Sequence, residues 1–167
     1  SDNDHGFIQI FNNQEYKMYY FKFELNECEF SKEKLFVKIG DNYLSDKGMK
    51  IKLSNEEIEL EIEVNFNDIK PLDNKFLRPN IMGPVYYLPK LECLHSLVSM
   101  HHFVNGNINY NKQEIILNNA IGYMEKDYGT SMPKWWVWSH MNDIESSFMI
   151  SIAKVKYLVH DFDGTLG

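Results

Sequence analysis

A strict two-residue alternation is the feature of this sequence that most limits its fold. Residues 58–66, IELEIEVNF, place an apolar side chain at every second position. Successive side chains of a β-strand point to opposite faces, so this pattern predicts a strand with one buried face and one wet face. The same period recurs in residues 16–25, 34–39 and 49–53, and no window carries a sustained helical stripe. An all-β, antiparallel chain is therefore expected.

Turn signals separate these segments, and Asn105-Gly106 is a dipeptide that favours a two-residue hairpin between apolar flanks. Many short strands with turns between them are typical of a β-barrel or a β-sandwich. Residues 67–90 interrupt the period with four of the five prolines. Because proline cannot donate to a strand ladder, we expect this stretch to be a long, ordered and packed connection.

Length and charge narrow the class of protein. A chain of 167 residues, 44% of them apolar, is expected to form one domain over residues 1–167. Its 24 acidic residues outnumber 17 basic ones, and without a basic run it is not expected to bind nucleic acid. Cys28 and Cys93 form no CxxC pair and are interpreted as free thiols. With no signal-peptide pattern and no transmembrane segment, the expected location is cytoplasmic.

The segment YLVHDFDGTLG, at residues 157–167, resembles the first motif of haloacid-dehalogenase-type phosphatases. That resemblance would make Asp161 the nucleophile and Asp163 the acid. In those enzymes the motif opens a parallel α/β domain, whereas the residues before it here have an antiparallel pattern. The preferred interpretation is a strand that ends in an Asp-Gly turn.

Three histidines, His95, His101 and His102, fall close together in a predicted strand. Residues at even separation share a strand face, so His95 and His101 would lie on the same side. Two imidazoles without a nearby acidic third ligand are weak evidence for zinc. Hydrogen-bonded or solvated histidines are preferred, and no metal is expected.

A charged cluster precedes the only three tryptophans of the chain. If the strand continues through Tyr123, Glu125 and Asp127 share one face and Lys126 points away from them. A carboxyl group in an apolar interior favours its protonated form, from which it could deliver a proton to an alkene or an ether oxygen. The alternative is a solvated loop whose charges aid solubility.

The tryptophans themselves divide between the two faces of the next strand. Trp136 and Trp138 would face one side and Trp135 the other. Bulky indoles on both faces indicate that something covers or occupies one of them, so we expect an apolar cavity. The residues expected to line it are Met82, Tyr86, Trp136 and Trp138, with Glu125 at the edge.

Residues 78–108 and 120–142 together resemble the tocopherol cyclase-like family. The family has a Pro-Gly-Ile-Met-Gly-Pro stretch, a Glu-Cys pair before a histidine, and a Gly-Tyr and Glu-Lys stretch before a tryptophan-rich strand. This chain has RPNIMGP, LECLH and GYMEKDYG in the same order, with departures at Asn80, Leu94, Tyr128 and Met132. The matching positions are Met82, Gly83, Pro84, Glu92, Cys93, His95, Gly122, Tyr123, Glu125, Lys126, Asp127, Gly129, Pro133 and Trp138.

The resemblance implies a fold and a reaction. The fold is a lipocalin-like β-barrel that holds a long apolar molecule, with this chain as the first half of a longer two-part protein. The reaction is a cofactor-free, acid-catalysed cyclisation of a prenylated quinol by an enzyme of the isomerase or lyase class, with no metal. The expected catalytic residues are Glu125, Asp127 and His95, and the expected ligand-binding residues are Met82, Tyr86, Glu92, Tyr123, Trp136 and Trp138.

A lipocalin-like protein that binds a lipid or isoprenoid without chemistry is the alternative. Either way, the expected partner is a hydrophobic small molecule: a prenylquinol, an isoprenoid or a lipid. Peripheral contact with a membrane is a further option. Unpaired strand edges invite pairing, so a C-terminal barrel half or a second copy of the chain is also an expected partner.

Overall fold

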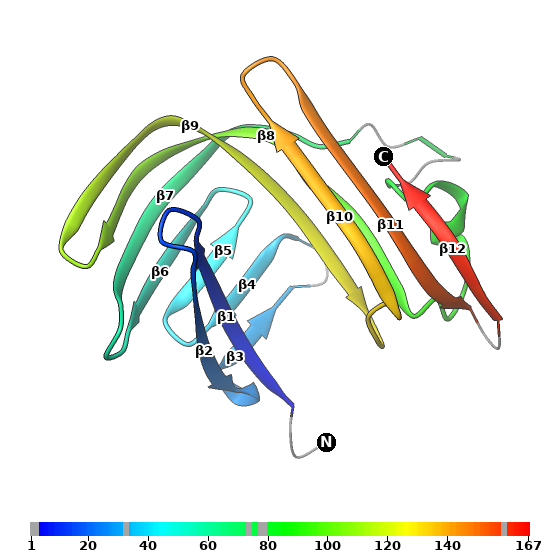
Figure 1. Cartoon of the computed structure of the whole chain (residues 1–167), viewed down its shortest axis with the longest axis horizontal. Coiled ribbons are helices and arrows are strands. Elements are labelled where there is room, and N and C mark those ends of the chain that lie inside the picture. The colour runs from blue at the N-terminus through cyan, green and yellow to red at the C-terminus, as the bar shows by residue number, and fades with distance from the viewer. Residues whose placement is uncertain (1–3, 32–33, 73–74, 77–79, 158–159) are drawn as a thin grey trace. The chain divides into compact units, whose positions relative to one another are not determined.

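The computed structural model describes residues 4–31, 34–72, 75–76, 80–157 and 160–167, which form twelve strands and two short 3-10 helices (Figure 1). Neither helix has the length or the apolar character needed to cross a membrane. In chain order the elements are β1 (His5–Asn12), β2 (Lys17–Glu24), η1 (Leu25–Glu27), β3 (Cys28–Phe30), β4 (Phe36–Ile39), β5 (Asn42–Ser45), β6 (Gly48–Ser54), β7 (Glu59–Lys70), η2 (Gly83–Tyr87), β8 (Cys93–Tyr110), β9 (Gln113–Gly129), β10 (Trp135–Asn142), β11 (Ser147–Tyr157) and β12 (His160–Leu166).

The strands form three sheets, with orders β1-β2, β10-β11-β12 and β3-β4-β5-β6-β7-β8-β9. The pairs β1–β2, β3–β4, β4–β5, β5–β6, β6–β7, β10–β11 and β11–β12 are antiparallel. The prediction of an all-β, antiparallel fold is confirmed. Of its two alternatives, the closed barrel is not formed by the described strands, because the longest sheet ends at β3 and β9 without pairing them.

The chain divides into two compact units, and a single domain over residues 1–167 stays a prediction. Unit 1 consists of Ser1–Asn67 and Val104–Ala120, and unit 2 consists of Asp68–Phe103 and Ile121–Gly167. The long strands β8 and β9 therefore contribute residues to both units.

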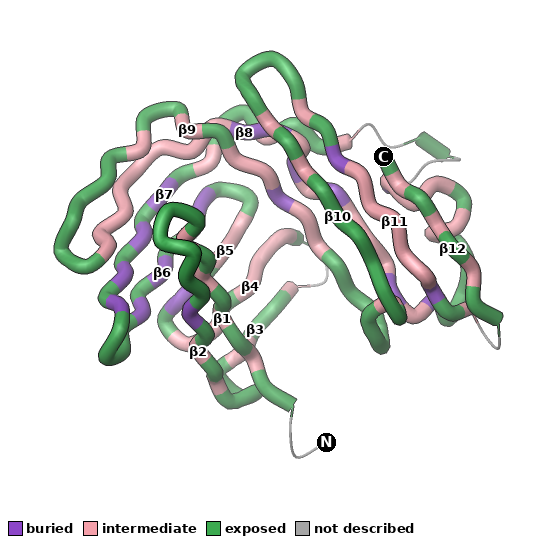
Figure 2. The backbone as a smooth tube through the Cα atoms, viewed as in Figure 1, coloured by how far each residue is buried: buried purple, intermediate pink, exposed green. Residues whose placement is uncertain are grey.

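Unit 1 owes its core to the predicted alternation. Along β7, Leu60, Ile62 and Val64 are buried while the glutamates between them are exposed (Figure 2). These residues pack with buried residues of β6 and with Tyr19 of β2, so the β1–β2 hairpin covers the sheet as a second layer. Tyr19 remains satisfied there, since its hydroxyl lies 2.9 Å from that of Tyr110.

The hairpin predicted at Asn105-Gly106 is wrong. Strand β8 runs through both residues, and the turn lies at Asn111 and Lys112, whose φ angles of 49° and 67° fit a tight primed turn. Gly106 serves another purpose, because a Cβ atom there would collide with the carbonyl oxygen of Glu63. Gly106 therefore allows β8 to approach β7 closely, and the chain does not turn at this residue.

The Asp-Gly turn expected near Asp163 is also wrong, and the phosphatase resemblance has no structural counterpart. Strand β12 continues past Asp163, and Gly164 pairs with Ala153 in an antiparallel register. Lys134 Nζ donates to Asp161 at 2.5 Å, and Lys154 Nζ lies 3.7 Å from Asp163. Both carboxylates therefore belong to ion pairs of an antiparallel sheet.

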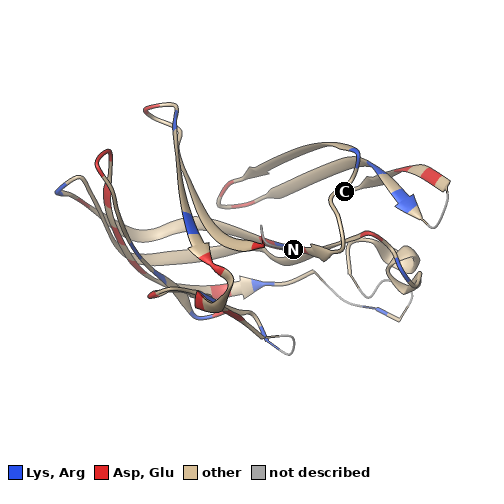
Figure 3. Ribbon diagram, turned by 90° about the horizontal axis from the view of Figure 1, so that it is seen from below, with Lys and Arg blue, Asp and Glu red and all other residues tan. Residues whose placement is uncertain are grey.

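Polar contacts connect the sheet β10–β12 to β8 and β9 within unit 2. The side-chain amide of Asn142 donates to the carbonyls of Met100 and Gly122 at 3.3 and 3.2 Å. Ser147 donates to the same Met100 carbonyl at 2.7 Å. Lysines and acidic residues occur both at turns and within strands of the described chain (Figure 3). The inner face of β10–β12 is thus fixed against the strands that carry the charged cluster.

Candidate functional site

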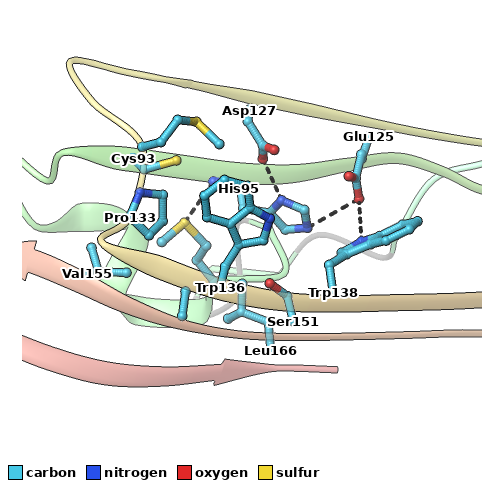
Figure 4. Close-up of a pocket in the computed structure, with 13 residues that line it drawn as sticks. Cys93, His95, Glu125, Asp127, Pro133, Trp136, Trp138, Ser151, Val155 and Leu166 are labelled. Carbon is cyan, nitrogen blue, oxygen red and sulfur yellow. Dashed lines mark hydrogen bonds and ion pairs between the residues drawn. The ribbon is translucent and has the colours of Figure 1, made fainter. Parts of the chain in front are cut away.

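A cavity of about 220 Å³ opens within unit 2 (Figure 4). It lies where the start of β8, the end of β9 and the sheet β10–β12 approach one another. Most of its wall is apolar, and one imidazole and two carboxylates supply the charged groups. The lining residues are Met82, Cys93, His95, Glu125, Asp127, Met132, Pro133, Trp136, Trp138, Ser151, Ala153, Val155 and Leu166.

His95 lies between the two carboxylates. Its Nδ1 is 2.5 Å from Asp127 Oδ1, and its Nε2 is 3.7 Å from Glu125 Oε2 (Figure 4). The His95 side chain is only 12% exposed, while those of Glu125 and Asp127 are 28% and 35% exposed. The Nε2 atom is buried and has no hydrogen-bond partner within the described residues. One ring nitrogen is therefore held, and the other is left for a ligand.

The charges around His95 favour its protonated form. Burial alone would lower the pKa of His95, but the hydrogen bond to Asp127 and the negative charges of Asp127 and Glu125 outweigh it and raise that pKa. Cys93, in the same cavity wall, has its pKa raised by burial and by nearby negative charge. The cavity thus combines an imidazole whose surroundings favour protonation with a thiol whose surroundings disfavour ionisation.

Two donors converge on Glu125. The hydroxyl of Tyr123 donates to Oε2 at 2.7 Å, and the indole N–H of Trp138 donates to the same oxygen at 3.1 Å. Burial, followed by the hydrogen bond to Glu125, raises the pKa of Tyr123, so its phenol keeps the proton that it donates. Glu125 has a fixed orientation as a result, with its carboxylate directed toward His95 (Figure 4).

The strand alternation that was expected around Glu125 is present. Strand β9 extends through Tyr123 to Gly129, and both Tyr123 and Asp127 contact the site on the Glu125 side. Lys126 instead has its ammonium 5.6 Å from the ring centre of Tyr128. The two carboxylates therefore share a face, and the lysine between them does not join it.

Of the residues predicted to bind a ligand, Met82, Trp136 and Trp138 line the cavity. The sulfur of Met82 also accepts a hydrogen bond from the His95 backbone N–H at 3.1 Å. Tyr123 reaches the site only through Glu125. Tyr86 lies outside the lining and accepts a long hydrogen bond of 3.4 Å from Tyr128.

Glu92 also lies outside the cavity wall, where it holds neighbouring segments together. One carboxylate oxygen accepts from Ser131 Oγ at 3.0 Å and the other from the Lys156 backbone N–H at 2.5 Å. The Glu92 carbonyl accepts a further bond from the Thr130 backbone at 2.8 Å. The structure gives Glu92 a bracing position, at the connection that supplies Met132 and Pro133 to the cavity.

One wall of the cavity was missed from the sequence. Ser151, Ala153 and Val155 of β11 line it, and Leu166 of β12 joins them opposite Ser151. The alternation of β11 was a usable signal, because these three residues are two apart and share a face. Ser151 and Ala153 were not predicted to line a cavity, because their side chains are small and are not typical of an apolar ligand-binding surface.

The other two histidines lie apart from this cavity. His102 is 2% exposed, and its Nδ1 lies 3.1 Å from Ser99 Oγ. A Cβ atom on Gly122 would collide with the His102 ring, so the glycine leaves room for it. His101 is also buried and meets Phe103 edge-on, with ring centres 5.1 Å apart. Neither histidine shares the cavity with His95.

Only one set of three groups in the described residues has ligand atoms close enough to share a cation. It is His95, Glu125 and Asp127, whose ligand atoms lie within 4.8 Å of one another. A protonated imidazole has no free lone pair to offer a metal. The ion-paired arrangement and a metal complex are therefore alternative states of these three groups.

Comparison with known proteins places the residues of this cavity largely within one family match. The model of the tocopherol cyclase-like family matches residues 73–156, half of the chain. No significant match is found among curated proteins or solved structures. The matched stretch includes η2, β8, β9 and β10 and therefore holds His95, both carboxylates and the tryptophans. On this match, the chain belongs to the tocopherol cyclase-like family.

Proposed function

We propose that the cavity of unit 2 binds the head group of a prenylated quinol, or of a similar isoprenoid, and cyclises it by acid catalysis. The observation that carries this proposal is the His95 imidazole, held between Asp127 and Glu125 in an otherwise apolar cavity with two indoles. The proposed setting is the cytoplasm, with the ligand taken from solution or from a membrane surface.

The protonated His95 is the acid in this mechanism. Its Nε2–H proton forms a C–H bond at the less substituted carbon of the prenyl double bond, and a tertiary cation forms at the other carbon. The phenol oxygen of the quinol attacks that cation and closes the ring. The Glu125 carboxylate accepts the phenolic proton and returns it to His95 Nε2, 3.7 Å away. Atoms and electrons balance without a redox step, so the product is an isomer of the substrate.

Asp127 and the indoles have supporting roles. Asp127 accepts from Nδ1–H and holds the ring so that Nε2 faces Glu125. The same ion pairing that keeps His95 protonated also makes it a weaker acid. Cation stabilisation by the π faces of Trp136 and Trp138, which line the cavity, therefore has to lower the barrier.

Binding without chemistry is the second candidate, and the exposure of the indoles favours it. Trp136 is 53% exposed and Trp138 is 41% exposed. A cation beside such indoles is open to attack by water, which would give an alcohol in place of the ring. A binding protein needs no such protection, so the same cavity would serve it unchanged.

The decisive experiment incubates the whole chain with a prenylated hydroquinone in D₂O and analyses the products by mass spectrometry. Cyclisation predicts a ring product that carries one non-exchangeable deuterium on carbon, from the proton delivered by His95. His95→Gln and Glu125→Gln should abolish turnover. Glu145→Gln is the matched control, because Glu145 is an exposed turn residue of the same unit.

Binding is measured in the same samples by tryptophan fluorescence, because Trp136 and Trp138 line the cavity and Trp135, the third tryptophan, is their neighbour in β10. Unchanged quinol together with a saturable fluorescence change would reject the cyclase and support the binding protein. Neither turnover nor a fluorescence change with prenylated quinols, isoprenoid alcohols and fatty acids would reject both.

A further inference from the structure

A second cavity, of about 260 Å³, lies within unit 1. It is bounded on one side by β1 and on the other by the sheet of β4, β5, β6 and β7. None of its lining residues contributes to the cavity of unit 2. They are Ile8, Gln9, Ile10, Val37, Ile39, Asn42, Tyr43, Leu44, Met49, Ile51 and Ile62.

The wall of this second cavity is aliphatic and offers no charged group. Its two amides already have partners. The Asn42 side chain donates to the Ile39 carbonyl at 3.0 Å and accepts from the Lys52 backbone at 2.7 Å. The Gln9 amide donates to the sulfur of Met18 at 2.5 Å. Since no buried polar group is left to orient a head group, this space suits a hydrocarbon.

The size of the cavity is sufficient for such an occupant. An enclosed apolar cavity of about 150 Å³ already has room for benzene. The unit 1 cavity is larger, and the core beside it is closely packed around Leu60, Ile58 and Leu53. The open space is therefore confined to the β1 side of the unit, where β1 faces β4 and β5.

The charge of unit 1 selects among amphiphiles. This unit holds 15 of the 24 acidic residues and 9 of the 17 basic ones, a net charge of −6. An anionic head group at the cavity mouth would meet an unfavourable potential, whereas a neutral one would not. Tyr43, 41% exposed at the cavity, presents a phenol to such a neutral group.

We propose that unit 1 contains a separate site for the hydrocarbon chain of a neutral lipid, such as a prenyl or long-chain alcohol. This site is independent of the cyclase proposal, because it shares no residue with the unit 2 cavity. It adds a binding capacity in a part of the chain that lies largely outside the family match at residues 73–156.

The two sites have separate reporters. Five isoleucines line the unit 1 cavity, whereas every tryptophan belongs to unit 2. The whole chain, labelled with ¹³C at the isoleucine δ1 methyls, is titrated with geraniol and observed by NMR. Saturable shifts are expected at Ile8, Ile10, Ile39, Ile51 and Ile62, with ligand NOEs to Ile51 and Ile62. Ile144 of unit 2, which is 77% exposed, is the internal control and should not move.

A pair of variants tests the cavity itself. Leu44→Phe fills it and should weaken geraniol binding at least tenfold, while Leu25→Phe, at a 56% exposed site of unit 1 outside the lining, should leave binding unchanged. Decanoate should bind at least tenfold more weakly than decan-1-ol because of the charge of unit 1.

The site is rejected if saturating geraniol leaves the five methyls unmoved or shifts all isoleucines alike. Equal binding of decanoate and decan-1-ol would reject the preference for a neutral lipid. The ligand NOEs in the unaltered protein keep the test valid if Leu44→Phe does not fold. Loss of the fluorescence response in unit 2 with retained methyl shifts would count against the cyclase proposal alone.

Discussion

Units 1 and 2 are both built from antiparallel strands, yet they bury different kinds of side chain. The core of unit 1 is a continuous cluster of aliphatic residues and Tyr19. Among the described residues, unit 1 buries one polar side chain, Asn42, whereas unit 2 buries Asn80, Ser99, His101 and His102 beside its apolar residues and holds the partly buried ion cluster around His95. Burial of apolar surface stabilises a fold, whereas buried polar groups cost free energy unless they are paired. Unit 1 is therefore expected to supply more of the stability, and unit 2 holds the candidate functional site.

The surfaces of units 1 and 2 also differ, in net charge and in the position of the exposed tryptophans. Exposed aromatic and aliphatic side chains occur on both units, but every indole lies on β10, where Trp135, Trp136 and Trp138 are between 41% and 53% exposed. Unit 1 carries a net charge of −6, while unit 2 has nine acidic and eight basic residues. Unit 2 therefore combines a nearly neutral surface with exposed indoles, a combination that favours contact with apolar molecules.

The largest effect is expected from Leu60→Ala in unit 1. Leu60 is 2% exposed in the centre of the cluster, and truncation of such a leucine costs about 2–5 kcal/mol. Urea unfolding followed by circular dichroism measures the loss. Glu59→Ala, at the neighbouring exposed position of β7, is the control and should cost far less.

Tryptophan fluorescence, recorded in the same urea titration of Leu60→Ala, tests whether the stability of unit 2 depends on unit 1. Because it reports only on unit 2, it shows whether unit 2 keeps its own transition when unit 1 is weakened. If the free energy of unfolding falls by less than 1 kcal/mol, by circular dichroism or by fluorescence, the stabilising role assigned to unit 1 is contradicted.

A smaller effect is expected from Gly122→Ala in unit 2. The added methyl group would collide with the ring of His102, which is 2% exposed and has little room to move. Overpacking of this kind costs about 1–3 kcal/mol. Gly164→Ala is the matched control in the same unit, because its Cβ atom would lie 3.8 Å from the Phe162 ring, an ordinary contact distance. Equal melting temperatures for the two variants would show that His102 can move aside.

The next effect depends on pH and concerns Asp127→Asn. The pKa of His95 is raised in the folded chain, so the ion pair contributes its full stability below the unfolded pKa of about 6.5. That contribution is lost as the pH rises through the folded pKa. Asp127→Asn removes the hydrogen-bonded charge, so the pKa of His95 should fall, which NMR titration of its ring detects directly.

Glu125→Gln is the graded comparison for Asp127→Asn. Glu125 lies 3.7 Å from the ring, and its charge contributes less to raising the pKa of His95. The pKa should therefore fall less than in Asp127→Asn. Burial lowers the pKa of His102, which reduces stability as the pH falls, but this effect is common to all variants and cancels in the difference. A larger effect of Glu125→Gln would overturn the assignment of Asp127 as the main partner.

The smallest effect is expected from Lys52→Gln in unit 1. Lys52 Nζ lies 2.5 Å from Glu61, but both side chains are largely exposed, at 73% and 48%. Exposed ion pairs contribute little to stability because water and salt screen them. The melting temperature should match that of the unaltered chain within error. A clear decrease would mean that unit 1 depends on its surface charges as well as on its core.

The period of two predicted the strands well because one face of β7 is buried and the other is wet. Dipeptides were poorer guides to where strands end. Asn105-Gly106 and Asp163-Gly164 both lie inside strands, and at Gly106 the glycine is needed because β7 approaches it closely. A local signal does not distinguish a turn from such a contact, which depends on residues far away in the chain.

The contact between His95 and Asp127 could not be predicted from the sequence either, because it depends on where the turn between β8 and β9 lies. A turn at Asn111 and Lys112 places His95 opposite residues near Asp127, whereas the turn predicted at Asn105-Gly106 would place it opposite residues near Ile116. The residue types of the site were therefore identified from the family motifs and the alternation of β9. To predict that His95 and Asp127 are in contact, the hairpin turn has to be placed at Asn111 and Lys112, and the sequence pattern predicted it at Asn105-Gly106.

The bracing position of Glu92 has a kinetic consequence. Its carboxylate holds Ser131 and the Lys156 backbone while its carbonyl holds Thr130. Met132 and Pro133, which follow directly, form part of the cavity wall. This wall can swing outward only when several of these bonds break together, an event much rarer than the rupture of any single one. The residence time of a ligand in this cavity is then expected to depend on Glu92, which lies outside the cavity wall.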